Sequence, residues 1–227
     1  MKTNEVLDFL LRERFIVIAR GVPENQIADV AEAVWRGGVR FFELTYDQTR
    51  SDALELMNRN MAHVCDRLGD KMILGTGTTI TVEQVAAAHQ AGAQFIVAPN
   101  TDVKVVQETK RRGLISCPGA LTPTEIANAY AFGGDLIKLF PAYPLGTAYI
   151  KAIRGPLSSV PLMATGGVNV DNIPALLASG VSVVGTAPTV ISPADLVAEN
   201  YEAITQKARQ HVEAIQAYRE MKKLKTT

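Results

Sequence analysis

The feature that most constrains the fold is a repeated alternation of short apolar runs with amphipathic segments that end at glycine. In the first repeat, 15–20 is apolar, 24–36 is amphipathic, and Gly37-Gly38 ends the repeat. Such runs are typical of strands buried on both faces, and such segments are typical of helices packed on one side. Further strands are predicted over 39–45, 72–75, 94–98, 114–117, 134–142, 161–165 and 181–184. Further helices are predicted over 51–68, 82–91, 103–112 and 170–178, after Thr122, and from about Pro193 onward.

Eight strand units within 227 residues favour a closed barrel over an open, doubly wound sheet. The mixed-charge amphipathic segment that follows Met1 predicts an additional N-terminal helix. No change of composition and no linker divides the chain, so we expect a single (β/α)8 TIM barrel domain over residues 1–227. The lysine-rich end, from about 221 to 227, is expected to be a frayed tail.

Charge and cysteine content argue against several kinds of partner. Lys and Arg together number 23, as do Asp and Glu, so no net charge attracts nucleic acid or an anionic membrane. Cys65 and Cys117 form no CxxC pair, which is typical of a reduced cytosolic protein. No apolar run approaches the ~20 residues of a membrane-spanning helix, and the first residues lack a signal-peptide core. We therefore expect a cytoplasmic protein that acts on a small molecule.

Lys138 stands in the sixth predicted strand among leucine, isoleucine and phenylalanine. Burial of an ammonium group is costly, and the usual escape is loss of the proton. The free amine that results can attack a carbonyl carbon and form a Schiff base. The alternative is an ordinary strand lysine whose long side chain reaches solvent.

Polar residues stand at the carboxyl ends of several predicted strands, where barrel enzymes hold their active sites. Alternation along the second strand places Glu43 and Thr45 on the same face as Phe41. The immediate neighbours of Glu43 are apolar, so its carboxylate needs a partner, and Lys138 lies in the same barrel mouth. The alternative is a purely structural ion pair. The polar strand ends are Arg20, Glu43, Thr45, Thr78, Lys138 and Thr165.

Two glycine-rich loops follow the seventh and eighth strands. Thr165-Gly166-Gly167 precedes a predicted helix, and Gly185-Thr186 follows the last strand. In barrel enzymes these loops commonly bind phosphate through backbone N–H groups. A tight turn without a ligand is the alternative for either loop alone. Their joint placement favours a phosphate site.

Motifs of other enzyme classes are absent from the sequence. His63, His89 and His211 each lie in a predicted helix without a second ligand at metal spacing, so we expect no metal and no cofactor. No GxGxxG follows the first strand, and neither a Walker loop nor a G-x-S-x-G elbow occurs.

These residues lie in segments that resemble the 2-keto-3-deoxy-6-phosphogluconate / 4-hydroxy-2-oxoglutarate aldolase family, the small class I pyruvate aldolases. The similarity runs in order over nearly the whole chain. The matching segments are 17–21, 37–39, 42–45, 75–78, 91–99, 117–119, 137–142 and 165–167.

The resemblance implies a metal-independent retro-aldolase, in a family whose members are typically homotrimers. It implies Lys138 as the Schiff-base lysine, Glu43 as the acid/base, Thr78 near the pyruvyl carboxylate and Gly166-Gly167 at the substrate phosphate. The full set of expected substrate contacts is Arg20, Thr45, Thr78, Pro99, Phe140, Thr165, Gly166, Gly167, Gly185 and Thr186.

The expected reaction cleaves 2-keto-3-deoxy-6-phosphogluconate, or 4-hydroxy-2-oxoglutarate, to pyruvate and an aldehyde (glyceraldehyde 3-phosphate or glyoxylate). One alternative is an aldolase for an unphosphorylated 2-keto-3-deoxy acid. Another is a non-catalytic binding protein for a sugar-acid phosphate on the same barrel. A third is a sugar-phosphate epimerase or isomerase, which would use Glu43 and leave Lys138 without a role.

Two positions depart from the family pattern. Many members have an arginine that grips the carboxylate where this chain has Asp47. Its task would fall to Arg20 or Thr78, or the substrate preference has shifted. We expect Arg20, oriented by Asp47, to bind the carboxylate, and Arg50 to face solvent or begin the helix; alternatively, Arg20 only neutralises Glu43. After the eighth strand, 185–187 reads Gly-Thr-Ala where the family often has Gly-Gly-Ser.

Overall fold

A computed structural model describes residues 2–224 of the chain. Parallel strands form one sheet in the order β5-β4-β3-β2-β1-β9-β8-β7-β6. The strands are β1 Phe15–Ala19, β2 Phe41–Thr45, β3 Ile73–Gly77, β4 Phe95–Val97, β5 Ile115–Cys117, β6 Gly119–Ala120, β7 Ile137–Leu139, β8 Leu162–Thr165 and β9 Val183–Thr186.

The ring of strands closes at Pro118. β5 and β6 are the two ends of the sheet order, yet they follow one another in the chain with only Pro118 between them. Proline has no N–H to donate, so it interrupts the ladder. Because β5 pairs with β4 and β6 pairs with β7, the two short strands together serve as one of eight. The predicted (β/α)8 barrel is confirmed.

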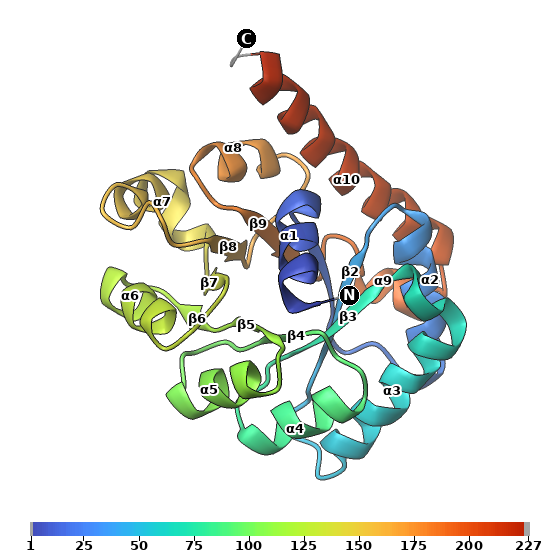
Figure 1. Ribbon diagram of the computed structural model, residues 1–227. Helices are drawn as coiled ribbons and strands as arrows, with labels where there is room; N and C mark the ends of the chain where they lie inside the picture. The colour runs from blue at the N-terminus through green and yellow to red at the C-terminus, as the bar shows by residue number, and fades with distance from the viewer. Residues whose placement is uncertain (1, 225–227) are drawn as a thin grey trace.

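The helices surround the ring of strands, and α1 lies across one end of it (Figure 1). The predicted N-terminal helix is therefore confirmed. The α-helices are α1 Thr3–Glu13, α2 Ile27–Arg36, α3 Ala53–Leu68, α4 Val82–Gln90, α5 Val103–Arg111, α6 Pro123–Ala131, α7 Gly146–Arg154, α8 Ile173–Ala178, α9 Pro193–Val197 and α10 Tyr201–Leu224. Short 3-10 turns are η1 Glu24–Gln26, η2 Gly69–Lys71 and η3 Tyr143–Leu145.

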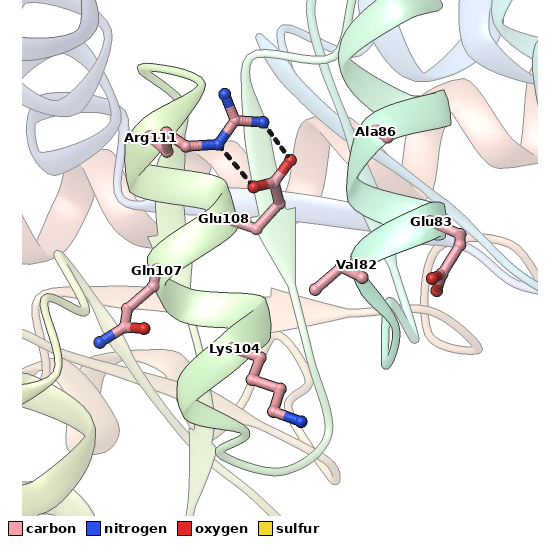
Figure 2. A pocket seen from close by; sticks show the side chains of 7 residues that line it. All are labelled: Val82, Glu83, Ala86, Lys104, Gln107, Glu108 and Arg111. Carbon is pink, nitrogen blue, oxygen red and sulfur yellow. Dashed lines mark hydrogen bonds and ion pairs between the residues drawn. The ribbon is translucent and has the colours of Figure 1, made fainter.

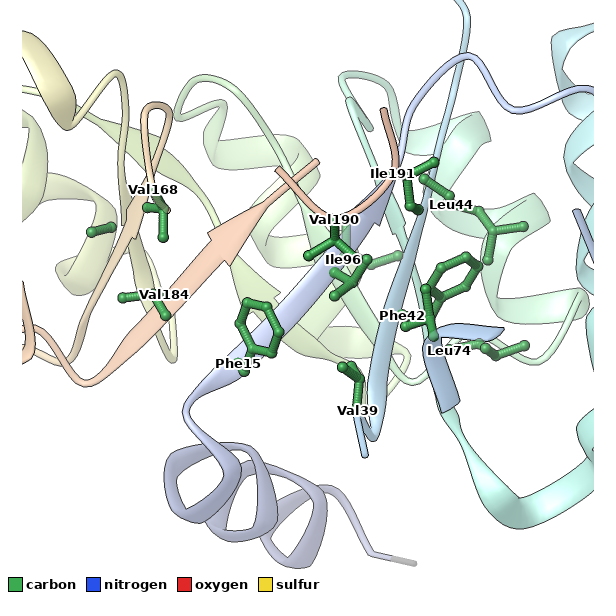
Figure 3. Packing of buried hydrophobic residues seen from close by; sticks show 14 of the residues in the cluster. Phe15, Val39, Phe42, Leu44, Leu74, Ile96, Val168, Val184, Val190 and Ile191 are labelled. Atoms are coloured by element: carbon green, nitrogen blue, oxygen red, sulfur yellow. The ribbon is translucent and has the colours of Figure 1, made fainter. Parts of the chain in front are cut away.

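Outward-facing side chains of the strands pack against the surrounding helices (Figure 3). On β2, Phe42 and Leu44 belong to this outer layer. On α2, buried Ile27, Val30 and Val34 recur at helical spacing, so one face of the helix meets the strands. Burial of each such side chain contributes about 1.5–3 kcal/mol, which explains why the amphipathic segments fold as helices here.

A second apolar layer fills the inside of the barrel at the amino ends of the strands. Val6 and Leu10 of α1 pack there with Phe41, Phe95 and other inward-facing side chains. The Phe41 and Phe95 ring centroids lie 6.1 Å apart, within the range of favourable aromatic pairing. Within residues 2–224 apolar side chains fill this end of the barrel, so a ligand would enter at the carboxyl ends of the strands.

Helix α7 was not predicted from the sequence. It begins at Gly146, a poor helix former, directly after η3, and no side chain caps its first turn. Its buried residues are Ile150 and Ile153, so the packing of one apolar face stabilises it in place of local start signals.

Several predicted boundaries also differ from the structure. β3 extends to Gly77, two residues beyond the expected end, because it pairs with β2 over its whole length as far as Thr45. The frayed tail expected from residue 221 is wrong for 221–224, which continue α10. Residues 225–227 of that tail lie outside the described residues. No helix within 2–224 is long and apolar enough to cross a membrane.

Candidate active site

Lys138 and Glu43 both point into the carboxyl half of the barrel. Lys138 is the middle residue of β7 and is 4% exposed, and Glu43 is the middle residue of β2 and is 1% exposed. The neighbours of each along its strand face the outer apolar layer, so alternation turns both ionisable groups inward. The interpretation of Lys138 as a strand lysine that reaches solvent is therefore wrong.

The surroundings of Lys138 favour its free amine. Burial lowers the pKa of Lys138, and the nearby Arg20 guanidinium lowers it further, against the opposite effect of Glu43. Nζ lies 4.8 Å from the centroid of the Phe140 ring. An uncharged, buried amine next to an open cavity can act as a nucleophile toward a carbonyl carbon.

Glu43 is a buried carboxyl group without a hydrogen-bond partner. Neither Oε1 nor Oε2 has one among the described residues. Burial raises the pKa of Glu43, opposed by the positive charges of Lys138 and Arg20. The structural ion pair considered from the sequence is not formed at hydrogen-bond distance. A buried carboxyl group with free oxygens can exchange a proton with a ligand or a water.

Gly77, at the end of β3, makes room for this carboxyl group. A Cβ atom at Gly77 would overlap Oε1 of Glu43. A glycine is therefore required at this position for the Glu43 side chain to lie where it does. The sequence alone showed the glycine only as part of a matching segment.

A cavity of 390 Å³ opens above Lys138. Its volume is within the range of small-molecule sites. The residues that line it come from β1, β7, β8 and β9 and from the segments that follow β1, β3, β4, β7, β8 and β9. They are Ile18, Arg20, Thr78, Pro99, Lys138, Phe140, Thr165, Gly166, Gly167, Thr186, Ala187 and Pro188. Most predicted substrate contacts are thus brought together, and Ile18, Ala187 and Pro188 were not predicted.

The predicted acid/base Glu43 is not part of this lining, and neither are two of the predicted substrate contacts, Thr45 and Gly185. Thr45 donates its hydroxyl to the carbonyl oxygen of Ala19 at 3.0 Å and lines a neighbouring pocket of 270 Å³ between the loops after β1 and β2. Gly185 pairs with Thr165 across β8 and β9 and lies beneath its hydroxyl. Thr45 is the last residue of β2, and its hydroxyl turns away from the cavity. Gly185 and Thr186 belong to β9, so the prediction that they follow the last strand is wrong.

Arg20 and Thr78 form one side of the cavity. Nη2 of Arg20 donates to Oγ1 of Thr78 at 2.9 Å. Asp47 does not orient Arg20, contrary to the expectation, because its Oδ1 accepts from the backbone N–H and the hydroxyl of Thr49. Arg50 pairs with Asp52 at 2.8 Å and is exposed.

The ends of β8 and β9, together with the loops after them, form another side of the cavity. Oγ1 of Thr165 is buried and has no hydrogen-bond partner among the described residues. Gly166 and Gly167 have φ angles of 90° and 80°, which favour glycine. The hydroxyl of Thr186 lies 3.1 Å from the carbonyl oxygen of Val168, as a donor to it. This side therefore offers hydroxyl groups and backbone rather than charged side chains.

A larger hollow, of 630 Å³, lies on the outside of the barrel between α4 and α5 (Figure 2). Glu108 and Arg111, which line it, form an ion pair at 2.7 Å. The hollow contains neither Lys138 nor Glu43, so its volume does not make it the reactive site. Within residues 2–224, no group of three or more His, Cys, Asp or Glu could hold a metal ion.

Comparisons with known proteins point to one family. A family model described as KDPG and KHG aldolase matches residues 8–207. A 2-dehydro-3-deoxy-phosphogluconate aldolase of Treponema pallidum is 33% identical over 170 residues, which cover 74% of this chain and 77% of that protein. A 2-dehydro-3-deoxy-6-phosphogalactonate aldolase of Escherichia coli is 30% identical over 207 residues, which cover 90% and 94%. The solved structure described as native KDPGal superposes with a TM-score of 0.81 at 28% identity, over 91% of this chain and 96% of that one. The chain therefore belongs to the KDPG and KHG aldolase family, whose members are carbon–carbon lyases.

Proposed function

We propose that Lys138 is the Schiff-base lysine of this aldolase. Its Nζ adds to the C2 carbonyl of a 2-keto-3-deoxy acid, and loss of one water leaves an iminium. The observation that carries the proposal is an amine that is 4% exposed, has a lowered pKa and lines a cavity of small-molecule size.

Glu43 is the proton carrier in this proposal. It serves the dehydration of the carbinolamine, directly or through one water, and then takes the proton of the C4 hydroxyl. As the C3–C4 bond breaks, its electron pair moves into the iminium to form an enamine, and C4 leaves as an aldehyde. The enamine takes a proton at C3, and hydrolysis releases pyruvate and the free amine. The unpartnered oxygens and raised pKa of Glu43 support this role.

Arg20 and Thr78 bind the pyruvyl carboxylate in this proposal. Both line the cavity, and the guanidinium donates to the Thr78 oxygen, so the threonine keeps its own proton for a ligand. A carboxylate in a partly buried site needs such charge-assisted partners.

The aldehyde half of the substrate lies toward the loops after β8 and β9. We propose a 2-keto-3-deoxy-6-phospho sugar acid, with glyceraldehyde 3-phosphate as the second product. The free hydroxyl of Thr165 and the glycine loop at Gly166-Gly167 support an oxygen-rich ligand there. The names of the relatives, a phosphogluconate and a phosphogalactonate aldolase, support the phosphate. An unphosphorylated acid and 4-hydroxy-2-oxoglutarate are the alternatives.

Borohydride trapping tests the mechanism. Incubation with pyruvate and borohydride is expected to add one reduced pyruvyl group, located by peptide mass spectrometry at Lys138. An unlabelled wild-type protein would contradict the proposal. Pyruvate release is then measured on matched phosphorylated and unphosphorylated 2-keto-3-deoxy acids. A thermal shift with the phosphorylated acid but no pyruvate release would indicate the non-catalytic binding protein instead.

We also propose that the protein is a homotrimer, which rests on its family membership. Sedimentation at micromolar concentration is expected to give three times the chain mass of 24.5 kDa. A monomer alone would contradict the proposal.

A further inference from the structure

Thr78 has an unusual backbone conformation. Its φ angle is 54°, in the left-handed region that β-branched residues rarely adopt. Such a conformation persists only where the surrounding structure holds it, and it is concentrated at functional sites. The groups that contact Thr78 therefore show how the protein holds this backbone conformation.

Two side chains hold Thr78 from different elements. Arg20, directly after β1, donates to its hydroxyl oxygen. Gln48, in the loop after β2, donates its Nε2 to the carbonyl oxygen of Thr78 at 2.7 Å. The first contact orients the side chain, and the second holds the backbone.

The amide of Gln48 is itself oriented by Gln84 on α4. Oε1 of Gln84 accepts from the backbone N–H of Ile80 at 2.7 Å, so its Nε2 must point away from Ile80. That Nε2 donates to Oε1 of Gln48 at 3.0 Å, which leaves the Gln48 NH2 group for the Thr78 carbonyl. Backbone N–H groups only donate and carbonyl groups only accept, so this chain of hydrogen bonds has one possible direction.

Contacts with neighbouring residues hold Gln84 in place at the start of this series of hydrogen bonds. It is 7% exposed and forms a capping box with Thr81 at the start of α4. The buried Tyr46 donates its hydroxyl to the backbone carbonyl of Gln84 at 3.0 Å. The loops after β2 and β3 are thereby tied together beside the cavity, although neither glutamine lines it.

We propose that Gln48, oriented by Gln84, is a positioning residue for the carboxylate of the 2-oxo acid. It holds Thr78 in the left-handed turn that keeps the threonine hydroxyl beside the Arg20 guanidinium. The proposal rests on the carboxylate contact assigned to Arg20 and Thr78 above.

The test compares two substitutions of one residue. Gln48→Met keeps the length of the side chain and removes both hydrogen bonds. Gln48→Glu keeps the acceptor for Gln84 but sets a carboxylate oxygen against the Thr78 carbonyl. We expect KM for the 2-keto-3-deoxy acid to rise about 5- to 10-fold in Gln48→Met and more in Gln48→Glu. In both, kcat should stay within about 2-fold, because saturating substrate restores the bound geometry.

Gln107→Glu is the matched control. Gln107 is exposed on α5 beside the outer hollow (Figure 2), so the same change of charge there should leave both KM and kcat as in wild type. Melting temperatures of all variants should lie close to wild type, which separates positioning from loss of fold.

An unchanged KM in Gln48→Met would overturn the proposal, as would an equal loss in kcat and kcat/KM. A rise in KM in Gln48→Glu alone would also overturn it, because added charge would then explain the effect. Failure of the catalytic proposal is distinguishable, since it would leave wild-type Lys138 unlabelled by pyruvate and borohydride.

Discussion

The two ends of the barrel are built from the same strands but present opposite chemistry. At the amino end, Leu10 of α1 and Phe41 of β2 fill the interior with apolar side chains. At the carboxyl end, the inward-facing residues are Glu43 and Lys138, below an open cavity. Phe41 and Glu43 are two residues apart on β2, so roughly 7 Å of strand separates the two environments.

This contrast shows that the apolar end also serves the chemistry. Burial is the main cause of the pKa shifts of both Glu43 and Lys138. The closed amino end keeps water from reaching them from below. A single apolar substitution at the amino end removes packing but leaves the reactive groups in place, so it should change mainly stability. Substitutions at the carboxyl end should change mainly activity.

Lys138→Met is the most severe test of this separation. We expect cleavage and pyruvyl labelling to be lost entirely, because no other amine lines the cavity in the described chain. The free energy of unfolding should not fall, because methionine fills a similar volume without a buried amine to desolvate. Urea unfolding and trapping by borohydride measure the two effects. Lys104→Met, an exposed change on α5, is the control; cleavage that survives in Lys138→Met would refute the assignment.

Glu43→Gln should lower kcat/KM by about 10²- to 10⁴-fold, the usual scale of lost acid–base catalysis.

Because burial raises the pKa of Glu43 above its ordinary 4.5, the folded state holds this proton to higher pH than the unfolded state. Wild-type stability should therefore fall as pH rises from about 4.5 to the raised pKa, while the Glu43→Gln variant lacks that contribution. Urea unfolding at several pH values measures this. A constant difference between the two proteins would mean that Glu43 is not buried as described.

Leu10→Ala tests the amino end. Leu10 is fully buried, so the substitution should lower the free energy of unfolding by about 2–5 kcal/mol, with kcat and KM of the folded protein unchanged. Asp8→Ala, at an exposed position of the same helix, should change stability by no more than about 0.5 kcal/mol. A loss of kcat without a loss of stability in Leu10→Ala would break the separation of the two ends.

Arg20→Ala sharpens the comparison within the carboxyl end. We expect a higher KM and a fall in kcat/KM of about 10²-fold, equivalent to ~2–3 kcal/mol for a lost charged hydrogen bond. Arg50→Ala is the matched control and should do little, because Arg50 pairs with Asp52. Steady-state kinetics on one substrate compare the two. The reverse result would mean that the loop after β2 holds the carboxylate.

Much of the reactive centre could be predicted from the order of residues. The inward direction of Glu43 and Lys138 follows from strand alternation, and the carboxyl end of a barrel is where such groups meet. Thr45 shows where this reasoning stops. It is on the predicted strand, but it is the last residue, and its hydroxyl turns to the Ala19 carbonyl instead of the cavity.

The sequence by itself determined the alternation of strands and helices, the barrel and the strand ends that carry polar groups. These follow from local periodicity and from glycine and proline, which act over a few residues. Only the tertiary structure decided that α7 forms, that Gly77 makes room for Glu43, and that Gln48 reaches Thr78. Each of these depends on atoms from distant parts of the chain that meet when the ring of strands closes, and no local pattern encodes such a meeting.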